Sequence, residues 1–228
     1  METRVLHACA FALTLRRACT RDGETILKTF NVTIDYFVPQ KEATSEIQNA
    51  LARLGATHLA ESTDVLPTER LKEALAVVRE TRAVADSPRQ ITALAPVLVN
   101  HGEGVNFGRL SAELEQVGLS RRLGWLVENI ITALAADLEA GNLAPRYVVR
   151  YQRARVFLDH FLSYFSKQKK DLRLLFAADD LLDHGIGSEE TLEAVKKECS
   201  EISSGWHVVT RIQPEDFRQA LEAARGAD

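Results

Sequence analysis

The sequence predicts an α+β fold that is mainly helical, with an N-terminal β-hairpin followed by a helical body. Two observations lead to this fold class. Apolar residues recur at three- and four-residue spacing over two long stretches in the middle of the chain, which is the pattern of a buried helix face. Clear alternation of apolar and polar residues, the period of a half-buried strand, is confined to Phe30–Tyr36. We therefore expect a central helical hairpin and a small amount of sheet.

The β-hairpin is predicted near the N-terminus. Phe30–Tyr36 is its clearer strand, and the apolar stretch Leu6–Leu15 is the candidate partner. Asp22-Gly23 lies between them and is a strong hairpin turn signal. The alanines of the first arm suit a helix better than a strand, so this arm is the less strand-like half of the hairpin.

Helices are expected after the hairpin. Glu42–Leu54 has an apolar inner side and stops before a glycine, and a second stripe runs from Pro67 to about Asp86. Ile91–Val99 is a short apolar stretch, and Asn100–Gly104 is a glycine-containing loop that makes the best internal boundary. The sequence thus favours two domains, residues 1–100 and 101–228, with one domain over residues 1–228 as the alternative.

The central helical hairpin is the clearest prediction. Ser120–Ala140 carries one continuous apolar stripe, and Gly141 and Pro145 mark the end of this helix and the start of the next. The second helix, Arg146–Phe165, places apolar and aromatic residues on one face and arginines at i, i+4 and i+7 on another.

The C-terminal part is expected to mix helices with one strand. We predict a basic connection over Lys167–Arg173, a helix over Leu172–Leu182, a helix from the N-cap Ser188 to Ile202, a strand within Trp206–Ile212 and a last helix over Glu215–Ala224. The strand could pair with the N-terminal hairpin.

Charge is distributed unevenly along the chain. The net charge of −4 and the pI near 5.9 argue against a generally basic nucleic-acid-binding protein. However, Arg146–Arg173 contains eight basic and two acidic residues, a local charge of +6, so the rest of the chain carries −10. The residues that we predict to bind nucleic acid or an acidic partner are Arg146, Arg150, Arg153, Arg155, Lys167, Lys169, Lys170, Arg121 and Arg122.

The aromatic residues of this basic segment leave two interpretations open. Tyr147 and Tyr151 could stack on bases while the arginines pair with phosphates, as in single-strand binders. Alternatively, the tyrosines point into the core and the arginines form a solvated face.

The stretch Leu110–Val127 resembles a helix-turn-helix unit, in which Gly118 makes the turn and Arg121 and Arg122 open a second helix that could enter a DNA groove. Gly124 replaces the buried aliphatic residue usual in that helix, and the helix is apolar enough for a core element. The run Arg122-Leu123-Gly124-Trp125-Leu126 also resembles a segment of AbiEi-type antitoxins. Residues 1–80 lack the winged helix of that family, so no function is inferred from it.

Other motifs give little support for chemistry. Asp179-Asp180-Leu181-Leu182-Asp183 matches the DDxxD motif that holds Mg²⁺ on a diphosphate, but a second carboxylate motif is missing, so we expect an acidic helix end. Asp159-His160 and Asp183-His184 are acid–histidine pairs without metal-ligand spacing. An active site assembled from these residues is the least favoured hypothesis. We predict no catalytic residue, no metal site and no cofactor.

The sequence favours a protein of the cytoplasm that does not span a membrane. Cys9, Cys19 and Cys199 form an odd set without CxxC spacing, and no stretch has the roughly 20 apolar residues of a membrane span. We expect a non-enzymatic interaction protein, a subunit or adaptor of a larger assembly with a protein partner or a second copy. The alternative is a nucleic-acid-associated regulator, or a nucleoprotein subunit that binds the phosphate backbone through residues 146–173.

Overall fold

The computed structural model describes residues 41–59, 73–84, 87–116, 118–175, 179–183 and 185–226. The chain divides into two compact units, Met1–Ala43 and Thr44–Asp228, and nearly all described residues belong to the second. This unit is mostly helical, which confirms the helical part of the predicted fold class. The predicted hairpin of Leu6–Leu15 and Phe30–Tyr36 lies outside the described residues.

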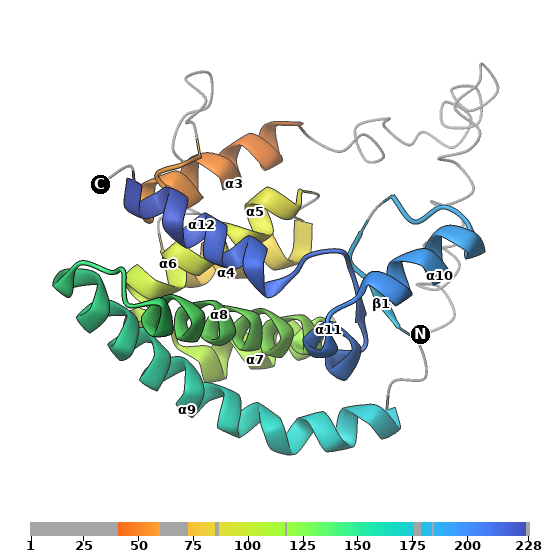
Figure 1. Cartoon of the computed structure of the whole chain (residues 1–228). Coiled ribbons are helices and arrows are strands. Elements are labelled where there is room, and N and C mark those ends of the chain that lie inside the picture. Colours follow the sequence, from red (N-terminus) through yellow and green to blue (C-terminus); the bar gives the residue numbers. More distant parts are fainter. Residues whose placement is uncertain are drawn as a thin grey trace. The chain divides into compact units, whose positions relative to one another are not determined.

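The predicted central hairpin is formed by α8 (Ser120–Ala140) and α9 (Pro145–Leu175), which pack against each other (Figure 1). The bounds of α8 are those expected from its apolar stripe. Gly141 ends the helix in the left-handed conformation, with φ of +69°, which glycine adopts without steric cost. Pro145 then starts α9, because the first residue of a helix needs no hydrogen-bonded N–H.

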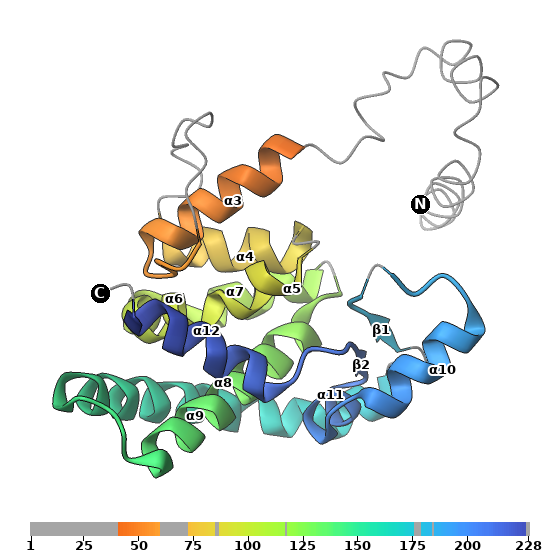
Figure 2. The same cartoon turned by 45° about the horizontal axis from the view of Figure 1, so that its top comes forward.

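Helix α8 is the centre of the core. The fully buried side chains of its inner face are Leu123, Trp125, Leu126, Val127, Ile130 and Leu134. Besides α9, the elements that pack on α8 include α7 (Phe107–Gln116), α11 (Glu201–Trp206), α12 (Pro214–Gly226) and the strand β2 (Val208–Val209). Figure 2 shows α12 lying alongside α8.

The helices before α7 include short ones where the sequence indicated only an apolar stretch and a loop. In chain order they are α3 (Lys41–Arg53), α4 (Ala74–Val84), α5 (Pro88–Thr92), α6 (Leu94–His101) and the 3-10 helix η3 (Gly102–Gly104). The predicted loop Asn100–Gly104 is therefore the end of α6 and η3. Pro96 fits inside α6 because it lies in the first turn, where backbone N–H groups have no partner within the helix.

The segment after the hairpin differs from the prediction in two ways. Lys167–Arg173 is not a connection, since α9 continues to Leu175 through residues with good helix propensity and no glycine or proline. Leu172–Leu182 is not one helix: Asp180–Leu181 forms the strand β1. This strand pairs in parallel with β2, with Asp180 opposite Val208. Within the described residues the partner of β2 is thus β1.

The helix expected from Ser188 to Ile202 is divided in two. Ser188 caps α10 (Glu189–Glu198), since its hydroxyl accepts a hydrogen bond from the backbone N–H of Thr191. Ser200 caps α11 in the same way, accepting from the N–H of Ser203. This second cap stops the first helix early. The last helix, α12, begins at Pro214 and ends close to its predicted position.

Candidate anion-binding cleft

The predicted binding residues fall into three groups in the structure. The exposed residues Arg146, Arg150, Arg153 and Arg155 lie on the first half of α9. Lys167, Lys169 and Lys170 lie farther along the same helix, where the structure describes the backbone alone. Arg121 and Arg122 lie in the first turn of α8.

Arg121 and Arg122 are directed at β1 instead of an open surface. Arg122 donates two hydrogen bonds to the carboxylate of Asp180, with Nε 2.7 Å from Oδ2 and Nη2 2.6 Å from Oδ1. The Nε of Arg121 lies 3.6 Å from Oδ2 of the same carboxylate. The exposed fractions of the three side chains are 12%, 17% and 10% in the order Arg121, Arg122 and Asp180. Such a two-point ion pair ties the start of α8 to β1.

The corner between α7 and α8 is therefore built for packing. Gly118 makes the turn with φ of +72°, as the resemblance to a helix-turn-helix requires. However, the helix that would enter DNA is a core helix whose inner face is fully buried, and its two leading arginines are held by Asp180. The corner thus offers little surface for base recognition.

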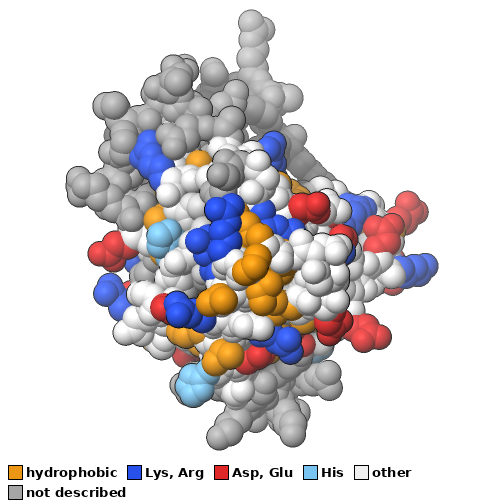
Figure 3. Space-filling model, turned by 60° about the vertical axis from the view of Figure 1, so that its left-hand side comes forward, with side chains coloured by type: hydrophobic (Ala, Val, Ile, Leu, Met, Phe, Trp, Pro, Cys, Tyr) orange, Lys and Arg blue, Asp and Glu red, His pale blue; other side chains and the backbone are white. Residues whose placement is uncertain are grey.

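Three of the α9 arginines line one cleft of about 510 Å³. Arg146, Arg150 and Arg153 contribute one wall from α9, and Arg53 joins them from the end of α3. We call this site the arginine cleft; its other lining residues are Gly55, Leu98, Val99, Asn100, His101, Glu103, Val149, Ala154 and Phe157. Figure 3 faces the side of the molecule where α8 turns into α9, and it shows Lys and Arg side chains gathered beside hydrophobic ones.

Two of these arginines are held in place by neutral groups. Arg146 donates from Nη2 to the hydroxyl of Tyr147 at 3.0 Å, and its Cζ lies 4.7 Å from the centre of the Tyr147 ring. Arg150 donates from Nη1 to Oδ1 of Asn100 at 3.0 Å, and its Cζ lies 5.8 Å from the same ring. The amide and the phenol orient the guanidinium groups without neutralising their charge.

Asn100 is itself fixed by the loop after α3. Gly55 has φ of +112°, and a β-carbon built on it would be 2.1 Å from Nδ2 of Asn100. The close contact requires glycine at this position. It places the amide oxygen of Asn100 where Arg150 reaches it. The arginine cleft is thus preorganised by α3, α6 and α9 together.

The cleft arginines differ from other arginines in the described part of the chain, which mostly have carboxylate partners. Arg155 pairs with Asp159 on the same helix, Arg211 with Glu198, and Arg218 with Asp137. By contrast, Arg146, Arg150 and Arg153 form no ion pair with any described residue. Their positive charges remain available for an anion.

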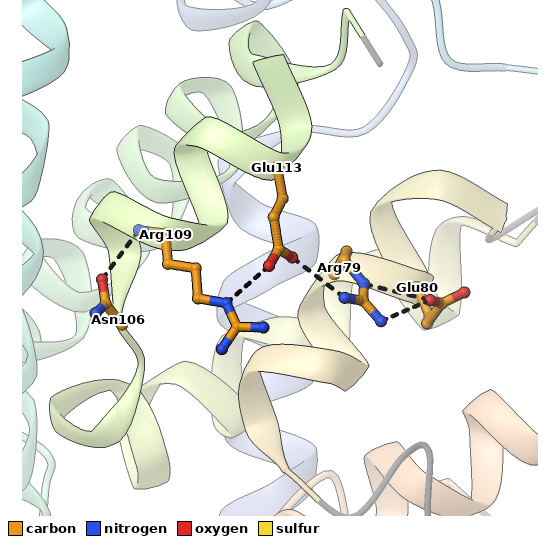
Figure 4. A network of polar contacts seen from close by, with 5 residues as sticks. All are labelled: Arg79, Glu80, Asn106, Arg109 and Glu113. Carbon is orange, nitrogen blue, oxygen red and sulfur yellow. Dashed lines mark hydrogen bonds and ion pairs between the residues drawn. The ribbon is translucent and has the colours of Figure 1, made fainter. Parts of the chain in front are cut away.

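Figure 4 shows the contrasting arrangement between α4 and α7. Glu113 accepts from Nε of Arg109 at 2.8 Å and from Nη1 of Arg79 at 3.2 Å, and Arg79 also pairs with Glu80. Asn106 supports the network by accepting from the backbone N–H of Arg109. The hydrogen bonds from the two arginines lower the pKa of Glu113. Here each arginine already has a carboxylate partner.

The tyrosines beside the basic residues are core residues. Tyr147 and Tyr151 are 7% and 2% exposed, so neither presents a ring face for stacking on a base. The hydroxyl of Tyr151 accepts a hydrogen bond from Arg225, which also pairs with the buried carboxylate of Asp137. Burial raises the pKa of Tyr151 to about 12, although the nearby charge of Arg225 acts in the opposite direction. These contacts favour the interpretation in which the tyrosines point into the core.

The carboxylates of the DDxxD run have separate structural roles. Asp179 pairs with Lys196 at 3.1 Å, Asp180 pairs with Arg122, and Asp183 accepts from the hydroxyl of Thr210 at 2.7 Å. The expected acidic helix end is instead the edge of the small sheet. Across the described ranges no group of three or more His, Cys, Asp or Glu side chains could hold a metal ion.

The acid–histidine pairs do not converge in the described structure. Asp159 and His160 are exposed on α9, where Asp159 pairs with Arg155, while Asp183 lies beside β1 and His184 is outside the described residues. A larger cleft of about 800 Å³ is lined by residues of α5 and α12, by the segments after β1 and before α12, and by His58. Its charged groups Arg89, Asp183, Arg211 and Asp216 are all hydrogen-bonded to protein groups already. We therefore assign the candidate site to the arginine cleft.

The sequence predicted the grouping of the residues that α9 contributes to this cleft. The i, i+4, i+7 spacing correctly grouped Arg146, Arg150 and Arg153 on one side of a helix. It missed Arg53 and Asn100, which come from α3 and α6. No sequence signal links these two positions to α9, because their proximity depends on how the helices pack.

The described helices include none that is long and apolar enough to cross a membrane. Comparison of the chain with models of protein families, with curated proteins and with solved structures finds no match.

Proposed function

We propose that this chain is a non-enzymatic interaction protein, a subunit or adaptor of a larger assembly, and that it binds an acidic segment of a protein partner in the arginine cleft. One observation carries the proposal: three guanidinium groups face one cleft, and neutral partners hold two of them. A guanidinium without a carboxylate partner can form two parallel hydrogen bonds with an incoming carboxylate. The partner is another protein or a second copy of this chain.

The cytoplasm is the proposed location. The chain has three cysteines without paired spacing, and Cys199 is present as a free thiol. Both features fit a reducing compartment.

Binding of a nucleic-acid backbone is the second candidate. It is supported by the continuity of α9, since Lys167, Lys169 and Lys170 follow the cleft arginines on one helix. A phosphate backbone could contact basic residues along such a helix. Because Tyr147 and Tyr151 are buried, they cannot stack on bases, and such binding would have to rely on the phosphate contacts.

A titration with labelled polyglutamate and labelled single-stranded DNA, each at low and high salt, tests the proposal. The triple variant Arg146→Glu, Arg150→Glu, Arg153→Glu should bind polyglutamate about tenfold or more weakly than the unmodified chain, because charged hydrogen bonds are lost. The control variant Arg109→Glu, Arg155→Glu, Arg211→Glu makes the same change in net charge at residues outside the cleft. It should retain binding.

An equal loss in both variants would show that net charge, and not the cleft, determines binding. Binding of DNA with no binding of polyglutamate would favour the second candidate. If neither probe bound at low salt, the arginine cleft would have no role in anion recognition.

A further inference from the structure

The arginine cleft also has apolar surface among its charges. Val149 lies between Arg146 and Arg150 in the sequence of α9 and is 51% exposed. It lines the cleft together with Phe157, which is partly buried, and with the buried residues Leu98 and Ala154. A site for simple charge neutralisation needs no such surface. The cleft can therefore bury an apolar side chain of its partner.

This apolar surface distinguishes between the kinds of anion. A nucleic-acid backbone carries no free aliphatic side chain beside its phosphates, and the bases would need an aromatic face that the buried Tyr147 and Tyr151 do not provide. An acidic protein segment can carry carboxylates and an aliphatic side chain within a few residues. The volume of about 510 Å³ suits a short segment of this kind.

The charges of the cleft fit the same partner. Arg146 and Arg150 are one helical turn apart, a separation of about 6 Å along the axis of α9. Side chains of a short peptide span this distance easily, so two carboxylates can reach the two guanidinium groups. Glu103 is the one carboxylate among the lining residues, all of which are described, so the cleft keeps a strong positive balance.

We infer that the arginine cleft recognises an acidic protein segment with an aliphatic residue beside its carboxylates, and that this aliphatic side chain packs on Val149. The inference rests on the proposed function, since it names the chemistry of the partner at the same site. The carboxylates supply attraction and the aliphatic residue supplies selectivity. Purely acidic segments and nucleic-acid backbones carry no such aliphatic side chain.

Two labelled peptides of equal charge, GDELDEG and GDESDEG, test the inference on the full chain by fluorescence anisotropy. We expect GDELDEG to bind about five- to tenfold more tightly, because its leucine buries apolar surface and the serine does not. Val149→Ser should remove this difference by weakening the binding of GDELDEG. Val156→Ser is the matched control, since Val156 is 72% exposed on the same helix and does not line the cleft.

The outcomes separate this inference from the proposed function. Equal affinity for the two peptides, together with loss of both in the Arg146, Arg150, Arg153 triple variant, would overturn the aliphatic anchor and keep the acidic partner. A difference that survives Val149→Ser would place the anchor elsewhere and also overturn the inference. Failure of both peptides to bind at low salt would overturn the inference and the proposed function together.

Discussion

The indole ring of Trp206 lies directly against the backbone of Gly124. A β-carbon built on the glycine would be 2.2 Å from Cη2 of the ring and 2.5 Å from Cζ3. The ring is also held by Glu128, one turn farther along α8, because Nε1 of Trp206 donates a hydrogen bond to its Oε2 at 2.5 Å. Gly124 thus allows α11 to approach α8, in place of the aliphatic residue that a helix-turn-helix unit would carry there.

Gly124→Ala is expected to lower the free energy of unfolding by about 1–3 kcal/mol, because the added methyl group forces the ring and the helix apart. The helix propensity of alanine acts in the opposite direction by about 1 kcal/mol. Urea denaturation measures the net effect. In a Trp206→Leu background the ring is absent, so the same substitution should stabilise the protein; destabilisation of equal size in both backgrounds would contradict this account.

Asp180→Asn is expected to destabilise the fold by about 3 kcal/mol. The substitution leaves the mostly buried guanidinium of Arg122 without its two-point carboxylate partner. Thermal or urea unfolding measures the loss. Asp159→Asn serves as the control, since the exposed pair of Asp159 with Arg155 should contribute less than about 1 kcal/mol. Losses of similar size in the two variants would show that the α8–β1 ion pair contributes no more to stability than an exposed ion pair does.

Stability should fall between about pH 10 and pH 12 partly through Tyr151. Its pKa is raised to about 12 in the folded state, against about 10 in an unfolded chain. The folded state therefore holds the phenol proton more tightly, and this contribution is complete below pH 10 and disappears as the pH rises through 12. Tyr151→Phe should make the fall in unfolding free energy shallower over this range. An unchanged slope would argue against burial of an ionisable phenol.

Acid should weaken the network in which Arg79 and Arg109 hold Glu113. Hydrogen bonds from Arg109 and then from Arg79 lower the pKa of the Glu113 carboxyl below its ordinary value of 4.5. This contribution to stability is present above pH 4.5 and is lost as the pH falls through the lowered pKa of the folded state. Glu113→Gln should therefore reduce the difference in unfolding free energy between pH 7 and pH 3. An unchanged difference in the variant would contradict this role of the two arginines.

The sequence predicted helices where two independent signals coincide. The bounds of α8 were correct because an uninterrupted apolar stripe ends at Gly141, and Pro145 then starts α9. The end of α9 was wrong because Lys167–Arg173 has helix propensity but no apolar pattern to reveal which structure it joins. A strand of two residues, such as Asp180–Leu181, has no measurable period at all. Its pairing with Val208–Val209 is a tertiary event that local signals do not record.

The candidate site was predictable to the extent that it lies on one helix. Arg146, Arg150 and Arg153 share a face by spacing alone. The ion pairs of Arg121 and Arg122 with Asp180 were not predictable, since charged residues far apart in the chain carry no mark of their partners. For this reason the local positive charge pointed to the helix that carries the arginine cleft, but only the three-dimensional contacts separate the arginines with carboxylate partners from those without.

The continuity of α9 has a consequence for any assembly that contains this protein. Beyond Arg150 the helix axis runs on for about 38 Å to Leu175, through residues that include no glycine or proline. Such a helix is a spacer of defined length that begins at the arginine cleft. A partner bound in the cleft and a second partner bound at the far end of α9 would be kept at a set distance. Insertion of a few residues into α9 between these two positions would rotate and displace one partner relative to the other.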